Sequence, residues 1–235
     1  MAPIADTEEP YQARWYRRIF STLLDALLPP HPDEALLAQH TESSIMKKAK
    51  TATPIAVPDT YAVLSYDDPL VHGLIHGLKF RKQKQYAQMM GRIIARALVK
   101  HTSLPKTVIV VAVPASKQGA RERGYDQGEC IAEAASTDLG ETAVYLPHAL
   151  LRASHLGAQT AYATRKARHK RMHGAFMASP SVKNRLFGAT VIAVDDVRTT
   201  GATLLEASRA LIHAGAKRVI CAAFAQTPEK SEARI

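Results

Sequence analysis

The sequence is poor in cysteine and has no long apolar run. Its 235 residues include only two cysteines, Cys130 and Cys221, which lie far apart. This gives no support to a disulfide framework or a Cys-x-x-Cys metal site, and we expect both to be small buried apolar residues. No apolar run reaches the ~20 residues of a membrane-spanning helix. Acids at Asp6, Glu8 and Glu9 argue against a signal peptide, so we predict a cytoplasmic protein without a membrane span.

Acidic residues are missing from one long stretch of the chain. No Asp or Glu lies between Thr142 and Val194, where Lys and Arg recur. The whole chain has 31 Lys and Arg against 21 Asp and Glu, a formal net charge of +10. Such an excess of positive charge favours anionic ligands, which include phosphates, nucleic acid and acidic proteins. Hydrophobic residues make up 46% of the chain, which indicates a packed globular core rather than disorder.

Short apolar runs alternate with helical patterns from Tyr61 onward. Strands are expected at 61–66, 108–113, 144–146, 175–177, 191–194 and 219–225, and helices at 69–78, 85–100, 127–139 and 204–213. This alternation predicts an α/β fold, a mostly parallel sheet with helices on both faces. We expect residues 61–228 to form this domain and 229–235 a tail. Residues 1–60 should be a helical appendage and linker, with helices at 11–28 and around 34–39.

The most informative segment runs from Val191 to Thr203. An apolar strand leads into Asp195 and Asp196, at the strand end where open α/β sheets bind ligands. The loop that follows consists of Thr199, Thr200, Gly201, Ala202 and Thr203, and a helix is expected from about Leu204. Backbone N–H groups of this loop and the helix start form an anion site, while carboxylates accept hydrogen bonds from vicinal hydroxyls. The segment predicts a ribose 5-phosphate site, although Asp-Asp after a strand also occurs in magnesium sites of other folds.

A second group of charges follows the predicted strand that ends at Val113. Lys117, Arg121 and Arg123 lie within one short loop at the same edge of the sheet. Three cations there suit a diphosphate, which needs charge neutralisation and several hydrogen-bond donors. The alternative is a solvated basic loop.

Four ordered segments resemble known proteins. The segment from Val191 to Thr203 closely resembles the binding motif of type I phosphoribosyltransferases for 5-phosphoribosyl-1-pyrophosphate (PRPP). Arg121-Glu-Arg-Gly-Tyr-Asp-Gln127 is similar to the Arg-x-Arg-Gly-Phe-Asn-Gln signature of ComF/GntX-type phosphoribosyltransferase-like proteins. Further landmarks of that family resemble Tyr66–Leu70 with Leu74–Phe80, and Arg152 with Gln159 and Gly174–Phe176. The likeness covers roughly Tyr61 to Ala225.

The resemblance implies the type I phosphoribosyltransferase fold and a role for each motif. Asp195 and Asp196 would be the catalytic acids that bind the ribose hydroxyls, and Thr199 to Thr203 would hold the 5′-phosphate. Lys117, Arg121 and Arg123 would bind the pyrophosphate. Mg²⁺ would be bound through the substrate, with the two aspartates as candidate ligands. The implied reaction transfers the phosphoribosyl group to an unidentified nitrogen acceptor and releases pyrophosphate.

The basic segment from Ala153 to His173 lies where type I phosphoribosyltransferases place a mobile active-site loop. Arg165, Lys166 and Arg168 are its candidate ligand-binding residues. A lid of this kind excludes water from the reacting centre. The alternative is a basic surface loop that contacts nucleic acid.

The sequence departs from the family at its N-terminal side. The family usually carries a zinc ribbon there, but no cysteine precedes Cys130, so we expect no zinc site. The resemblance also implies an alternative function, as a non-catalytic accessory protein in DNA uptake or use (competence). Its partners would be a nucleotide, single-stranded DNA or a DNA-processing protein. A homodimer is expected from the resemblance alone.

Overall fold

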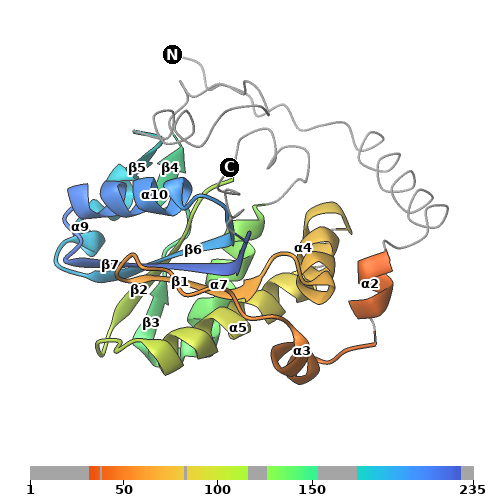
Figure 1. Ribbon diagram of the computed structural model, residues 1–235. Coiled ribbons are helices and arrows are strands. Elements are labelled where there is room, and N and C mark those ends of the chain that lie inside the picture. The colour runs from red at the N-terminus through yellow and green to blue at the C-terminus, as the bar shows by residue number, and fades with distance from the viewer. Residues whose placement is uncertain (1–31, 38, 82–83, 116–125, 153–173, 229–235) are drawn as a thin grey trace, which may run out of the picture.

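The computed structural model describes residues 32–37, 39–81, 84–115, 126–152 and 174–228 (Figure 1). The helix predicted at 11–28 lies outside these residues. Within them, no helix is both long enough and apolar enough to cross a membrane.

A five-stranded parallel sheet forms the centre of the molecule. Its strand order is β1-β7-β6-β2-β3. The strands are β1 Thr60–Ser65, β2 Val108–Ala112, β3 Ala143–Tyr145, β6 Thr190–Arg198 and β7 Arg218–Gln226. The three inner strands, β2, β6 and β7, contain long apolar runs because a parallel sheet is covered on both faces. All five strands end at the same edge, which is where the polar side chains collect.

Three long helices cover one face of the sheet: α4 Pro69–Arg81, α5 Lys84–His101 and α7 Gln127–Leu139. Their buried side chains pack against alternate residues of the strands, among them Val110, Ile192 and Val194. Figure 1 shows α5 on this side of the sheet. The face is rich in fully buried Leu and Ile side chains, so it forms the larger part of the core.

The opposite face is covered by α10 Ala202–His213 and by a small antiparallel sheet of β4 Leu150–Arg152 and β5 Phe176–Ala178. The intervening strand residues, among them Val111, Val191 and Ala193, pack here. The connections between these elements contain three short helical segments: η1 Gly140–Thr142, η2 Pro180–Val182 and α9 Lys183–Leu186. The predicted α/β class is therefore confirmed, with helices on both faces.

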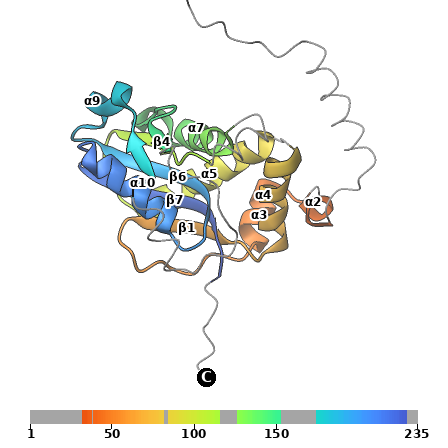
Figure 2. The same cartoon turned by 90° about the horizontal axis from the view of Figure 1, so that it is seen from above.

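Two short helices precede the sheet, α2 Pro32–Leu37 and α3 Glu42–Lys48. Figure 1 and Figure 2 show both at one end of the sheet, with α2 beside α4. The carboxylate of Glu42 pairs with Arg92 at 2.7 Å and with Arg96 at 2.8 Å, which fixes α3 to α5. The sequence predicted a helix near α2 but missed α3, whose seven residues are too few for a clear period. Its start is marked by the Thr41 side chain, which accepts a hydrogen bond from the Ser44 N–H.

Three local expectations differ from the structure. Strand β6 continues through both aspartates to Arg198 instead of ending at Val194, because it stays paired with β7 up to Gln226. Helix α10 begins at Ala202, two residues before the predicted start. Both cysteines are free, but only Cys221 is buried in the core, whereas Cys130 is partly buried.

Candidate sugar-phosphate site

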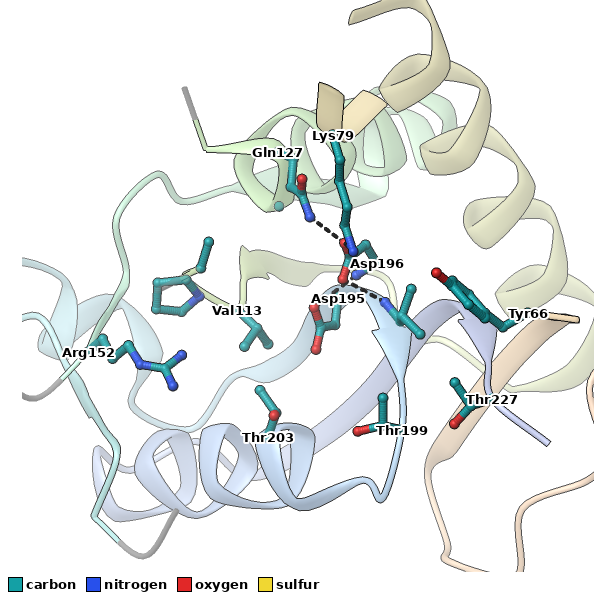
Figure 3. Close-up of a pocket in the computed structure, with 14 residues that line it drawn as sticks. Tyr66, Lys79, Val113, Gln127, Arg152, Asp195, Asp196, Thr199, Thr203 and Thr227 are labelled. Atoms are coloured by element: carbon teal, nitrogen blue, oxygen red, sulfur yellow. Dashed lines mark hydrogen bonds and ion pairs between the residues drawn. The ribbon is translucent and has the colours of Figure 1, made fainter. Parts of the chain in front are cut away.

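The alternation of β6 gives the two aspartates different surroundings. Ile192 and Val194 face the layer of α4, α5 and α7, whereas Val191 and Ala193 face the layer of α10. Successive side chains of a strand point to opposite faces, so Asp196 continues the first series and Asp195 the second. Figure 3 shows this arrangement, with Asp196 toward Lys79 and Gln127 and Asp195 on the side of Thr203.

Asp196 is held by donors from both of its neighbouring helices. The ammonium group of Lys79, in the last turn of α4, lies 3.0 Å from Asp196 Oδ2. The Nε2 amide of Gln127, the first residue of α7, donates to the same oxygen. Asp196 Oδ1 accepts the backbone N–H of Val197 at 2.7 Å. Both carboxylate oxygens therefore already have donors, and the side chain is only 13% exposed.

Among the described residues, Asp195 accepts fewer hydrogen bonds than Asp196, and its surroundings disfavour its negative charge. Its Oδ1 accepts the backbone N–H of Asp196 at 2.9 Å. Burial, and then the like charge of Asp196, raise the pKa of the Asp195 carboxyl well above its usual range. On the same side, burial lowers the pKa of Arg152, and the negative charge of Asp195 works against that change. The guanidinium of Arg152 lies 5.4 Å from the ring centre of Phe176.

These groups line one cavity of about 450 Å³ at the carboxyl ends of the strands. Its walls are formed by Tyr66, Lys79, Val113, Pro114, Ala115, Gln127, Gly128, Arg152, Asp195, Asp196, Val197, Thr199, Thr203 and Thr227. Of the residues predicted from the sequence, Asp195, Asp196, Thr199 and Thr203 lie on this lining. The volume is large enough for a small phosphorylated sugar.

The other predicted loop residues, Thr200, Gly201 and Ala202, shape the turn rather than line the cavity. Gly201 has φ 79°, a left-handed conformation that glycine adopts without strain, and it is the N-cap of α10. A Cβ at this position would lie 3.0 Å from Nε of Arg198. The hydroxyl of Thr200 accepts the N–H of Ala202 at 3.4 Å. The turn places the start of α10 beside the cavity, which Thr199 and Thr203 line, and a helix start favours an anion.

The start of α7 forms the opposite wall. Asp126 is its N-cap and accepts the N–H of Gly128 at 2.9 Å, and it also accepts the N–H of Ala115 at 3.4 Å. A Cβ on Gly128 would lie 3.0 Å from the carbonyl oxygen of Val113, so glycine lets α7 approach the end of β2. The predicted diphosphate residues Lys117, Arg121 and Arg123 lie outside the described residues, as do Arg165, Lys166 and Arg168. Ala115, the last described residue before the segment of Lys117, and Gln127, which follows that segment, both line the cavity.

The sequence assigned no role to several residues of the lining. Lys79, Gln127 and Arg152 occur in segments that resemble the family, yet nothing in their spacing placed them beside the aspartates. Tyr66 and Thr227 follow β1 and β7 directly, so a rule that polar residues at parallel strand ends meet would have found them.

The donor chemistry of the site fits Mg²⁺. The candidate ligands are oxygens, namely the two carboxylates and the side-chain carbonyl of Gln127, and Mg²⁺ prefers oxygen. Gln127 is buried, and its Oε1 has no hydrogen-bond partner among the described residues. No group of three or more His, Cys, Asp and Glu that could hold a metal occurs in the described part of the chain. The set fits an ion that keeps waters and shares its coordination with substrate phosphates.

Comparison with known proteins finds a matching family model, a similar sequence and similar structures. The phosphoribosyl transferase domain family matches residues 143–234. The DNA utilization protein YhgH of Salmonella typhi is 27% identical over 165 residues, which is 67% of this chain and 67% of that protein. The hypoxanthine phosphoribosyltransferase of Staphylococcus aureus is 11% identical, with a TM-score of 0.38, over 65% of this chain and 69% of that chain. The glutamine PRPP amidotransferase of B. subtilis is 17% identical, with a TM-score of 0.38, over 58% of this chain and only 25% of that chain.

The parallel sheet, its layers and the matched domain define the class: this is a protein with the type I phosphoribosyltransferase fold. Within that class the motifs of the chain resemble those of the ComF-type phosphoribosyltransferase-like proteins, and a protein named for DNA utilization is 27% identical to it.

Proposed function

We propose that this protein binds PRPP together with Mg²⁺ and transfers the phosphoribosyl group to a nitrogen acceptor, with release of pyrophosphate. One observation carries the proposal. Two adjacent carboxylates and two threonines at the start of α10, Thr199 and Thr203, border the same cavity of about 450 Å³. Carboxylates suit the ribose hydroxyls and the helix start suits the 5′-phosphate. Lys79 and Arg152 bring positive charge to the same walls.

The residues of the chain would act by binding and orienting the sugar. The acceptor nitrogen attacks C1′ while the bond from C1′ to the pyrophosphate oxygen breaks, and the acceptor loses its proton. Asp195 and Asp196 fix the ribose hydroxyls, so that C1′ faces the acceptor. Negative charge grows on the leaving pyrophosphate, where fixed cations stabilise it. When bound, Mg²⁺ would neutralise part of that charge. The loop cations Lys117, Arg121 and Arg123 belong to this proposal as pyrophosphate ligands.

Calorimetry with PRPP and ribose 5-phosphate tests the binding site. The double variant Asp195→Asn/Asp196→Asn removes two charge-assisted acceptors, so PRPP affinity should fall by at least about 100-fold. The matched control Glu133→Gln/Glu141→Gln also removes two negative charges, from exposed positions away from the cavity. It should bind like the wild type. Equal affinity of the double variant and the wild type for PRPP would refute the assignment of these acids.

The transfer step needs its own test, because PRPP binding alone does not establish turnover. Pyrophosphate release from Mg²⁺–PRPP is measured across a panel of nucleobases and amines. A phosphoribosyltransferase releases pyrophosphate with at least one acceptor and forms the matching N-glycoside. Tight PRPP binding without release in any mixture would favour a sensor or accessory role.

The second candidate is that accessory role in DNA use. It is favoured by the similarity to a protein named for DNA utilization and by the formal net charge of +10. Single-stranded DNA binding should then weaken steeply with salt, because phosphate contacts release counterions. DNA binding that is unchanged by PRPP and by Asp195→Asn/Asp196→Asn would support a surface separate from the cavity.

Three broader expectations belong to the same proposal. We propose a boundary at residues 60 and 61 between the N-terminal extension and the phosphoribosyltransferase-type domain, with a tail at 229–235. The cytoplasmic location and the homodimer are likewise proposed. Size-exclusion chromatography with light scattering checks the last of these.

A further inference from the structure

Oδ2 of Asp196 cannot accept a ribose hydroxyl without first giving up a donor, because a carboxylate oxygen has two lone pairs and two donors already use them. This oxygen is shared by the ammonium group of Lys79 at 3.0 Å and by the amide of Gln127, and Oδ1 holds the Val197 N–H. A ribose hydroxyl at Oδ2 therefore requires an exchange of partners when the ligand enters. Lys79 and Gln127 are the two candidates to move, and they differ in freedom. Gln127 is buried, whereas the Lys79 side chain is 28% exposed and borders the cavity.

The backbone that carries Lys79 is firmly placed. Helix α4 presses against α2 at Gly73, where a Cβ would lie 2.5 Å from the carbonyl oxygen of Asp33. Beside it, Nδ1 of His72 lies 2.6 Å from the carboxylate of Asp33. One turn later, a Cβ on Gly77 would lie 2.4 Å from the ring of Tyr86 in α5. Two close helix contacts thus fix α4, and the position of Lys79 at the cavity is a built feature of the fold.

The side chain of Lys79 is free to swing although its helix is not. A lysine carries a compact cation on a flexible four-carbon stem, so its Nζ can move several ångströms while the Cα stays in place. Lys79 lies on the same side of the cavity as Gln127, with which it shares Asp196 Oδ2. Asp195 points away from Lys79, toward the side of Thr203 (Figure 3). A sugar held by the Thr-Thr-Gly turn at its 5′ end would extend its diphosphate toward the wall of Lys79.

We propose that Lys79 is a ligand-binding residue, which holds Asp196 in the ligand-free site and transfers its contact to the diphosphate of bound PRPP. The exchange frees Asp196 Oδ2 for a ribose hydroxyl. It also supplies a cation from a rigid helix at the leaving group. The inference rests on the proposed function and names a residue that the motifs did not assign to the site. It predicts that Lys79 distinguishes PRPP from ribose 5-phosphate, which has no diphosphate.

The test compares the affinities of PRPP and ribose 5-phosphate by calorimetry in Mg²⁺ buffer. Three variants are measured: Lys79→Met, which removes the charge, Lys79→Arg, which keeps it, and Lys79→Gln, which keeps a donor for Asp196 and so protects the fold. Lys183→Met, an exposed lysine of α9 outside this cavity, is the control for net charge. The ratio of the two affinities is the quantity read, because a general loss of site geometry affects both ligands.

The preference for PRPP should fall about 10- to 100-fold in Lys79→Met and Lys79→Gln, since one charge-assisted hydrogen bond is lost. Lys79→Arg and Lys183→Met should keep it within about threefold. An unchanged ratio in Lys79→Gln overturns the proposal, whether both affinities fall or neither does, because Lys79 would then only position Asp196. A wild type that binds neither ligand refutes the proposed function itself, which is a different result.

Discussion

Two ion pairs lie at opposite ends of the same sheet and differ in nearly every respect. At the amino end of β7, Arg218 donates from Nε to Asp59 at 3.0 Å and from Nη2 to the other carboxylate oxygen at 2.5 Å. Arg218 also donates to the carbonyl of Ser103 and to the hydroxyl of Thr102. At the carboxyl end, Lys79 contacts Asp196 through a single nitrogen that borders a cavity. The first pair uses its donors within the protein, and the second can release its donor to a ligand.

The pKa values of the carboxyls show the same contrast. The hydrogen bonds from Arg218 lower the pKa of Asp59 below its usual range, so the folded protein favours its charged form. Burial and a like charge raise the pKa of Asp195, so the folded protein disfavours the charge that a sugar would need. Asp59 therefore stabilises the fold, whereas Asp195 stores unfavourable energy that a ligand can relieve. Sites of function are commonly maintained at such a cost in stability.

Removal of Mg²⁺ should produce the largest effect at the carboxyl end. With EDTA in place of Mg²⁺, PRPP affinity should fall by about 100-fold or more, because the ion neutralises diphosphate charge worth several kcal/mol. Ribose 5-phosphate affinity should change less. Calorimetry with and without the chelator measures both. Equal losses of affinity for the two ligands would indicate that the metal is bound by the carboxylates alone and not by the diphosphate.

A side chain at the Thr-Thr-Gly turn should weaken phosphate binding. In Gly201→Ala the left-handed backbone costs about 1–2 kcal/mol, and the new Cβ lies against Arg198. We expect about a tenfold loss of ribose 5-phosphate affinity.

The matched control for this turn is Gly188→Ala. Gly188 has φ 72° but no atom within 4 Å of an added Cβ, so it carries the backbone strain without the site. It should lower stability and leave affinity unchanged. A similar loss of affinity in both variants would show that strain alone, not the turn, is responsible.

Breaking the pair at the amino end should destabilise the fold without affecting the ligand. Arg218→Met leaves Asp59 without its main donor, and the side chains are 35% and 32% exposed, so the loss should be about 1 kcal/mol. This corresponds to a fall in melting temperature of roughly 2–4 °C. Differential scanning calorimetry measures it, with Lys217→Met as the neighbouring charge control. An Arg218→Met protein that melts like the wild type would show that the pair contributes nothing.

Loss of the Asp195 charge, at the carboxyl end of the sheet, should stabilise the fold. Asp195→Asn removes a charge that burial and Asp196 both disfavour, so melting temperature should rise by roughly 1–3 °C while PRPP affinity falls. The control is Asp138→Asn on the exposed surface of α7. A lower melting temperature in Asp195→Asn would mean that the carboxylate stabilises the ligand-free fold.

Acid should remove the difference between wild type and Asp59→Asn. The pKa of Asp59 in the folded protein lies below its ordinary value of 3.8, so the stabilisation is present above that pH. It is lost as the pH falls below 3.8 through the lowered pKa. Urea unfolding from pH 7 to pH 3 should therefore show the two free energies of unfolding converging at the acid end. A difference that grows toward pH 3 would contradict the pairing.

The sequence predicted the part of the site that is local along the chain. Asp195, Asp196 and the Thr-Thr-Gly turn follow one another, so a strand and a helix start suffice to place them together. Lys79 and Arg152 come from other elements, on opposite faces of the sheet, and only the packing of α4 and β4 brings them to the cavity. Long-range contacts of this kind leave no period in a single sequence.

For the fold, too, the sequence predicted the features that are local along the chain and missed those that depend on distant segments. The long apolar runs of β2, β6 and β7 identified the sheet because each is buried on both faces. Strand β4 was missed because it has only three residues and pairs with β5, far along the chain. The predicted strand end at Val194 is too early. Acidic residues usually mark the end of a buried strand, but here β6 continues through Asp195 and Asp196 while it remains paired with β7.

The adjacency of the two aspartates has a consequence for how this segment can change. Because neighbours on a strand face opposite layers, one residue inserted after Val194 would exchange their surroundings. Asp195 would then meet the lysine-bearing helix, and Asp196 would meet the turn at α10. The segment is therefore intolerant of insertions and deletions even where it tolerates substitutions. Two consecutive acids are the shortest arrangement by which a single strand serves both layers of the molecule.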